Sequence, residues 1–121
     1  MITITIFQNQ GQNVGLESFG HVQFAEAGND IVCAAVSILV INTINSIEQF
    51  TEDGMTLDVK DPDATGVVSK HFKKHDNYLK FMLTEDVSRE SKVLMDSLVL
   101  GLEEINKQYG DSYLTLNFRE V

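Results

Sequence analysis

Cysteine, proline and basic residues are scarce in this 121-residue chain. The single cysteine cannot form an intramolecular disulfide, so we expect a reducing, cytoplasmic compartment. One proline and the lack of an internal repeat argue against disorder and against a repeat architecture. Nine basic residues against eighteen acidic ones give a formal net charge of −9, which argues against nucleic acid as a direct ligand. The charge is explained either by a basic partner or simply by solubility.

Long apolar runs are also missing. The longest run, residues 31–41, contains Cys33 and Ser37 and is shorter than the ~18–20 apolar residues of a membrane span. The first six residues alternate in polarity and carry no basic segment, which indicates a strand and not a signal peptide. The length and the 43% hydrophobic content fit one domain over residues 1–121.

A two-residue periodicity predicts the strands. Ile2, Ile4 and Ile6 alternate with other residues, and a turn over 8–13 leads to the extended segment 14–20, so a first hairpin is expected. The same alternation or a similar composition predicts four further strands, over residues 55–59, 66–72, 78–83 and 113–118.

Two segments are long enough to be helices. An apolar stretch follows Asn29 and Asp30 and continues to Phe50, which predicts a helix over 30–50 that is apolar on most of its circumference and largely buried. Leucines at spacings of four predict a second helix over 88–109, ended by Gly110 as a left-handed cap. The order β-β-α-β-β-β-α-β predicts an α+β fold, a two-layer sandwich with a mostly antiparallel sheet and two long helices.

Cys33 and His21 are the candidate catalytic residues. A thiol attacks as a thiolate, and both a helix N-terminus and a nearby imidazole favour that form. We expect Cys33 in the first turn of its helix, where unpaired backbone N–H groups would also receive an oxyanion. His21, at the end of a strand and across a short loop, would serve as the base. The alternative is that Cys33 is a small hydrophobic residue of the core.

Asp30, Cys33 and Ser37 are spaced three and four residues apart and share one stripe of the predicted helix. The stripe indicates a site facing a cleft; alternatively Asp30 caps the helix and Ser37 bonds back to a carbonyl. His71 and His75 bracket two lysines in a predicted loop, and without a third ligand nearby we expect no metal there. No cofactor motif is present.

Gly20-His21, followed after a short loop by GNDIVCAAVS over residues 28–37, resembles the bacterial ribosomal-processing cysteine protease (Prp) family. The Met-Ile-Thr start, the length and the order of elements are also similar to that family. The resemblance implies a cysteine endopeptidase with a Cys-His dyad that removes a short N-terminal extension from a large-subunit ribosomal protein, a basic partner. It also implies a homodimer with a compact sheet-and-helix fold.

Residue by residue, the resemblance makes Cys33 the nucleophile and His21 the catalytic histidine, with Gly20, Asp30 and Ser37 at supporting positions. The loop over residues 22–27, which holds Phe24 and the charged Glu26, departs from the rest of the match. Two other functions are compatible with the sequence. One is a non-enzymatic, acidic interaction module that binds a ribosomal or assembly partner, and the other is a thiol-based redox or acyl-carrying protein.

Overall fold

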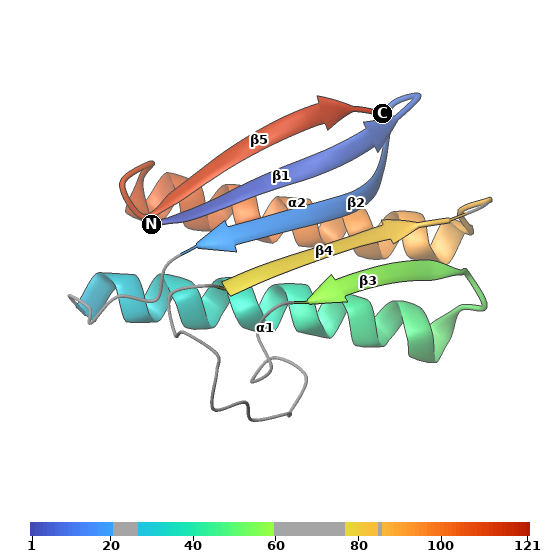
Figure 1. The fold of residues 1–121 in the computed structure, drawn as a ribbon, viewed down its shortest axis with the longest axis horizontal. Helices are drawn as coiled ribbons and strands as arrows, with labels where there is room; N and C mark the ends of the chain where they lie inside the picture. Colours follow the sequence, from blue (N-terminus) through green and yellow to red (C-terminus); the bar gives the residue numbers. More distant parts are fainter. Residues whose placement is uncertain (21–26, 60–76, 85) are drawn as a thin grey trace.

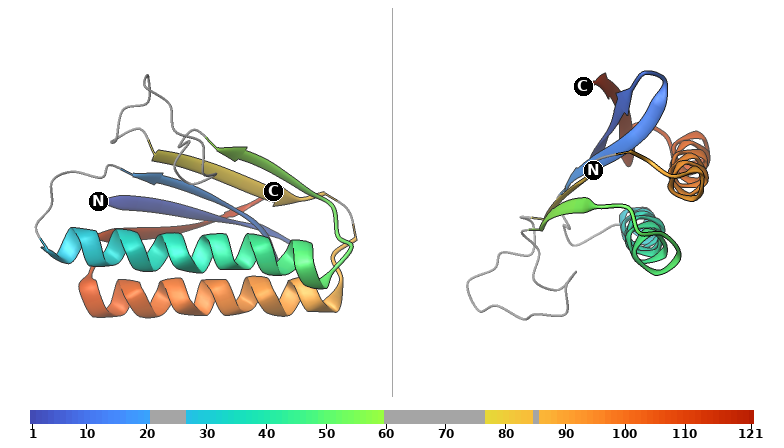
Figure 2. Two further views of the ribbon diagram at one scale, coloured as in Figure 1. Left: turned by 90° about the horizontal axis from the view of Figure 1, so that it is seen from below. Right: turned by 90° about the vertical axis from the view of Figure 1, so that its right-hand side faces the viewer.

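The structure, a computed structural model, describes residues 1–20, 27–59, 77–84 and 86–121. Two helices cover one face of a five-stranded sheet, as the views in Figure 1 and Figure 2 show. The strand order is β3-β4-β2-β1-β5, and every neighbouring pair is antiparallel except β1 and β5. The predicted two-layer α+β fold is confirmed. The strands are β1 (Ile2–Asn9), β2 (Gln12–Gly20), β3 (Met55–Val59), β4 (Asn77–Leu83) and β5 (Leu114–Glu120).

The predicted first hairpin is confirmed and has a two-residue turn. Asn9 pairs with Gln12, and the turn residues Gln10 and Gly11 have φ angles of 51° and 80°. Positive φ at both central residues matches the right-handed twist of the flanking strands, and glycine adopts it without steric cost. The register shifts by one residue between Phe7 and Gln8, and this irregularity brings Ile6 opposite Leu16, both fully buried.

The helices α1 (Ala27–Phe50) and α2 (Arg89–Tyr109) lie side by side and run in opposite directions (Figure 2). Ser88 is the N-cap of α2, and its hydroxyl accepts a hydrogen bond from the Ser91 amide. Gly110 ends α2 with φ 89° and ψ 171°. The positive φ expected of a glycine stop is present, but ψ lies outside the left-handed helical region that we predicted.

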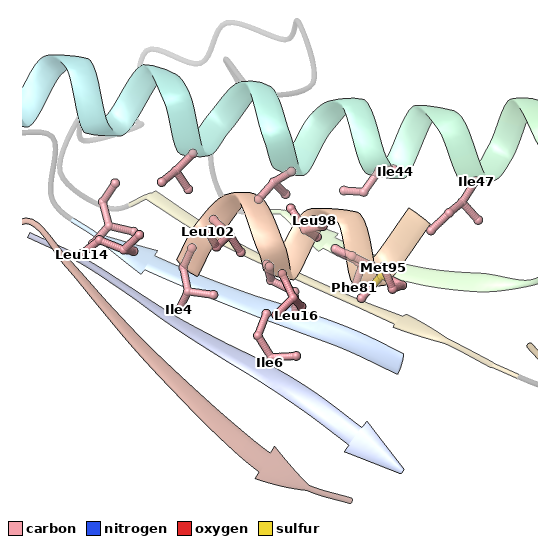
Figure 3. Packing of buried hydrophobic residues seen from close by; sticks show 14 of the residues in the cluster. Ile4, Ile6, Leu16, Ile44, Ile47, Phe81, Met95, Leu98, Leu102 and Leu114 are labelled. Atoms are coloured by element: carbon pink, nitrogen blue, oxygen red, sulfur yellow. The ribbon is translucent and has the colours of Figure 1, made fainter. Parts of the chain in front are cut away.

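The core lies between the sheet and the helices (Figure 3). Ile2, Ile4 and Ile6 are 7%, 0% and 0% exposed, as their alternation predicted. The helices contribute apolar rows at helical spacing, and the two rows pack on the same face of the sheet: Val32, Val36, Val40, Ile44 and Ile47 from α1, and Met95, Leu98, Val99 and Leu102 from α2.

Helix α1 is less buried than its composition predicted. Ile31, Ile38 and Phe50 are 52%, 67% and 69% exposed. The prediction was wrong because a helix that packs on a sheet and on one neighbouring helix covers only part of its circumference. The segment Ile31–Phe50 is long and apolar enough to cross a membrane, although its longest unbroken apolar run, residues 31–41, is too short. The core helix of a globular protein meets the same length and hydropathy test.

Two sequence predictions lie outside the described residues. The expected strand over residues 66–72 and the turn before it fall within residues 60–76, so that strand stays a prediction. Among the described elements the order is therefore β-β-α-β-β-α-β.

Asp53 links the end of α1 to the start of α2, and its charge should contribute to stability. Its carboxylate accepts hydrogen bonds from the Ser88 amide (3.0 Å) and the Ser88 hydroxyl (2.7 Å). Hydrogen bonds from the Ser91 and Ser88 side chains hold the pKa of Asp53 below its ordinary value of 3.8. Because the folded state lowers this pKa, the stabilisation is present above pH 3.8 and is lost as the pH falls through the folded value.

We therefore expect Asp53→Asn to lower the free energy of unfolding at pH 7 by about 1 kcal/mol. The difference from the parent should shrink as the pH falls below about 4. Urea unfolding between pH 7 and pH 3 measures both, with the exposed neighbour Glu52→Gln as control. A difference that stays constant across this range would contradict the role of the charge.

Candidate active site

Gly20 is the last residue of the central strand β2 and lies between two neighbouring strands. It pairs with Ile2 of β1 on one side and with Asn77 of β4 on the other. A Cβ at this position would lie 3.2 Å from the Ile2 Cα and from the Met1 carbonyl oxygen, which is tighter than ordinary contact. Glycine therefore lets β1 approach the end of β2 closely. His21 is the next residue in the sequence and lies outside the described residues.

Cys33 lies on α1 and is half-buried, packed against the core cluster. Its position is about 120° around the helix from Leu39, by the 100° step of an α-helix. The side chain of Leu39 meets α2 at Gly101, where an added Cβ would approach its Cδ1 to 2.9 Å. Cys33 therefore occupies the border of the buried face, on the flank of α1 that turns away from α2.

The predicted place of Cys33 in the first helical turn is wrong. Helix α1 begins at Ala27, three residues before the predicted start, so Cys33 is its seventh residue. Only the first amides of a helix lack a backbone acceptor, and the effect of the helix dipole fades within the first turn. Helix α1 therefore does not supply an oxyanion site at Cys33 itself, and activation of the sulfur depends more on a neighbouring base.

Two other predicted support residues, Asp30 and Ser37, belong to α1. Ser37 is exposed, one turn after Cys33 and about 40° further round the helix. Asp30 is the fourth helical residue, so the alternative in which it is the N-cap is also wrong. The stripe predicted from the spacing is compatible with α1 as the structure shows it.

Several other candidates are not placed. His71, His75, Phe24 and Glu26 lie outside the described residues. Within residues 1–20, 27–59, 77–84 and 86–121, no group of three His, Cys, Asp or Glu side chains could hold a metal ion. A described hollow of about 450 Å³ is lined by Phe50, Arg89, Glu90, Val93 and Leu94, away from Cys33.

An aromatic cluster at the end of β2 is a feature that the sequence analysis missed. Phe19 and Tyr78 are cross-strand partners, and their rings meet edge to face at 6.4 Å between centroids. The Tyr78 hydroxyl donates a hydrogen bond of 2.7 Å to Glu17 Oε2. This bond, burial and the charges of Glu17 and Asp58 raise the pKa of Tyr78 to about 12. This contact could not be predicted from the sequence, because Glu17 and Tyr78 are 61 positions apart and meet only through the pairing of β2 with β4.

Comparisons with known proteins show the family to which the chain belongs. The family model described as "Cysteine protease Prp" matches residues 1–114. The ribosomal processing cysteine protease Prp of Bacillus subtilis is 27% identical over 115 residues, covering 93% of each chain. The protein of the same name from Staphylococcus aureus is 22% identical over 120 residues, covering 98% of this chain and all of that one.

Solved structures share the fold. SMU.848 from Streptococcus mutans superimposes with a TM-score of 0.78 at 24% identity, covering 100% of this chain and 96% of that one. The essential ribosomal processing protease Prp from S. aureus, in complex with a covalently linked product peptide, has a TM-score of 0.78 at 22% identity, covering 98% of this chain and 100% of that one. Since the family model spans nearly the whole length, the chain belongs to the cysteine protease Prp family and is a cysteine protease.

Proposed function

We propose that this chain is an endopeptidase that removes a short N-terminal extension from a large-subunit ribosomal protein, with Cys33 as nucleophile and His21 as general base. One observation carries the assignment of Cys33. A member of a cysteine protease family needs a thiol, and the only cysteine of this chain lies half-buried on an outer flank of α1. A nucleophile needs that combination of accessibility and a rigid support.

His21 is proposed from its place in the chain. It directly follows Gly20 in the sequence, and Gly20 is the last residue of β2, paired with both β1 and β4. Only five residues separate His21 from the start of the helix that carries Cys33. Cys33 lies beyond the first turn of α1, so the free backbone amides of that turn do not activate its sulfur alone. An imidazole close to the sulfur is therefore needed to favour the thiolate.

The proposed chemistry is acyl transfer in two steps. His21 accepts the proton of the Cys33 thiol, and the sulfur attacks the scissile carbonyl carbon. The tetrahedral intermediate expels the amine, which His21 protonates. His21 then removes a proton from water, the hydroxide attacks the thioester, and Cys33 leaves as the thiol after reprotonation. Oxyanion donors outside the first turn of α1 are required, and Asp30 and Ser37 are proposed to support the site from the same flank.

The substrate is proposed from two observations. The structurally similar S. aureus protein has been solved with a substrate peptide, with a TM-score of 0.77 to this chain. The net charge of −9 on this chain would attract a basic ribosomal protein through electrostatic steering. We also propose that the protein is cytoplasmic, because its single cysteine suits a reducing compartment. The family resemblance supports a homodimer.

Cleavage of a defined peptide tests the proposed function. We expect the protein to cut a peptide that covers the N-terminal extension of the large-subunit ribosomal protein from its own source organism at one bond, as measured by mass spectrometry. A peptide with the same composition in shuffled order is the control and should stay intact. Binding of the extension peptide without cleavage would instead support an acidic interaction module. Cleavage of both peptides at equal rates would contradict the proposed substrate.

A further inference from the structure

We propose that Tyr78 is a positioning residue for catalysis: together with Phe19 and Glu17 it clamps the end of β2, the strand that leads in sequence to the proposed base His21. This inference rests on the proposed dyad and adds a residue to it. Neither the sequence pattern nor the family comparison points to Tyr78.

The clamp lies on the sheet face opposite the helices. Cross-strand side chains of β2 and β4 alternate between the two faces, and Leu16 and Phe81 form a fully buried pair on the helix side. Glu17, Phe19 and Tyr78 therefore point to the other side, which neither α1 nor α2 covers (Figure 2). The clamp does not touch Cys33, because the sheet lies between them, so any effect on catalysis must pass through the backbone of β2.

Tyr78 holds β2 at two points. Its ring lies against Phe19, the residue before Gly20, and its hydroxyl donates to Glu17, two residues earlier on the same face. A neutral hydroxyl that donates to a carboxylate forms a short, strong bond, here 2.7 Å from the Tyr78 oxygen to Glu17 Oε2. The Tyr78 side chain thus contacts β2 at residues 17 and 19, close to the C-terminal end of the strand.

The opposite side of β2 is held by close packing. A Cβ on Gly20 would press on Ile2 and Met1 of the neighbouring chain segment. With β1 fixed on one side and Tyr78 on the other, the end of β2 has little freedom to shift. Proton transfer between sulfur and imidazole depends on placement to within about 0.5 Å, so a fixed strand end is of direct value to the reaction.

Tyr78→Phe tests the clamp because it removes one hydroxyl and keeps the ring. We expect kcat for the extension peptide to fall about tenfold while KM changes less than about twofold, since the substrate contacts are untouched. The rate of Cys33 alkylation by iodoacetamide should shift its pH profile toward the ordinary thiol pKa of about 8.5, because the imidazole is less well placed. Loss of fold stability alone would not move that profile.

The chain offers a matched control and a rescue. Tyr113 forms the same kind of edge-to-face pair with Tyr109, at 6.2 Å, and Tyr113→Phe should leave kcat and the alkylation profile unchanged. Glu17→Gln keeps an acceptor for the Tyr78 hydroxyl and should retain most of the activity, whereas Glu17→Ala should reproduce Tyr78→Phe. The double variant Tyr78→Phe/Glu17→Ala should be no worse than either single variant.

Two outcomes would overturn the inference. If Tyr78→Phe matches the parent in kcat and alkylation profile while Cys33→Ala is inactive, the dyad stands and the clamp does not. If Tyr78→Phe and Tyr113→Phe lose activity equally, the effect is general and not positional. Full activity of Cys33→Ala would instead remove the proposed dyad, on which the clamp depends.

Discussion

Cys33→Ala should reduce cleavage of the extension peptide by at least about a thousandfold, because the variant has no nucleophile and keeps only binding. The fold should survive, since Cys33 is half-buried and its truncation removes one atom from the border of the core. We expect a loss of at most about 1.5 kcal/mol in the free energy of unfolding. Peptide cleavage followed by mass spectrometry and urea unfolding measure the two effects separately.

A displaced thiol is the matched control for Cys33. Ala34 is the next residue, exposed and about 100° round the same helix, so Cys33→Ala/Ala34→Cys restores a cysteine in the wrong direction. This variant should not cleave, and iodoacetamide should modify it with a pH profile near the ordinary thiol pKa of about 8.5. The parent should react at lower pH. Cleavage by Cys33→Ala, or by both variants, would place the nucleophile elsewhere.

Phe81→Ala should lower the free energy of unfolding by about 3–5 kcal/mol, which lowers Tm by about 15 °C. Phe81 is a fully buried residue of β4, paired with Leu16 of the central strand, and belongs to the core cluster to which both helices contribute (Figure 3). Its removal leaves a cavity that the close-packed layers cannot fill. A loss of this size is a large part of the total stability of an ordinary domain.

Phe118→Ala provides the comparison for Phe81. Phe118 is the same residue type on edge strand β5, but it is 47% exposed. We expect its truncation to cost less than about 1 kcal/mol, as for most exposed positions. Thermal unfolding of both variants at one pH decides between them. Equal losses would mean that burial in the two-layer core does not account for the stability.

Much of the fold could be predicted because local patterns agree with the tertiary structure. The alternation of Ile2, Ile4 and Ile6 gave β1 its buried face, and the leucine spacing located α2 to within one residue. The start of α1 could not be located as well. Asn29 and Asp30 have the composition of an N-cap, yet the helix begins at Ala27, because cap residues are also tolerated in the first turn. Because of that three-residue difference, Cys33 lies beyond the first turn of α1, and activation of its sulfur depends more on a neighbouring base.

The candidate site was predictable only in part. The single cysteine, Cys33, could be identified from the sequence as a candidate nucleophile within an apolar helix, and the resemblance to the family supported that role. The exposure of Ile31 and Ile38 could not be predicted, because it depends on which side of α1 meets the sheet and which meets α2. The contact between Tyr78 and Glu17 depends on strand register, which is set by the packing of whole strands.

The sequence by itself determined the strand and helix periods, the acidic charge and the single thiol, because each is a property of residue type and spacing along the chain. The tertiary structure alone decided that β1 and β5 pair in parallel, that Cys33 lies on the flank away from α2, and that an aromatic clamp holds the end of β2. These features join residues far apart in the chain. They follow from how two layers share one core, which no local pattern specifies.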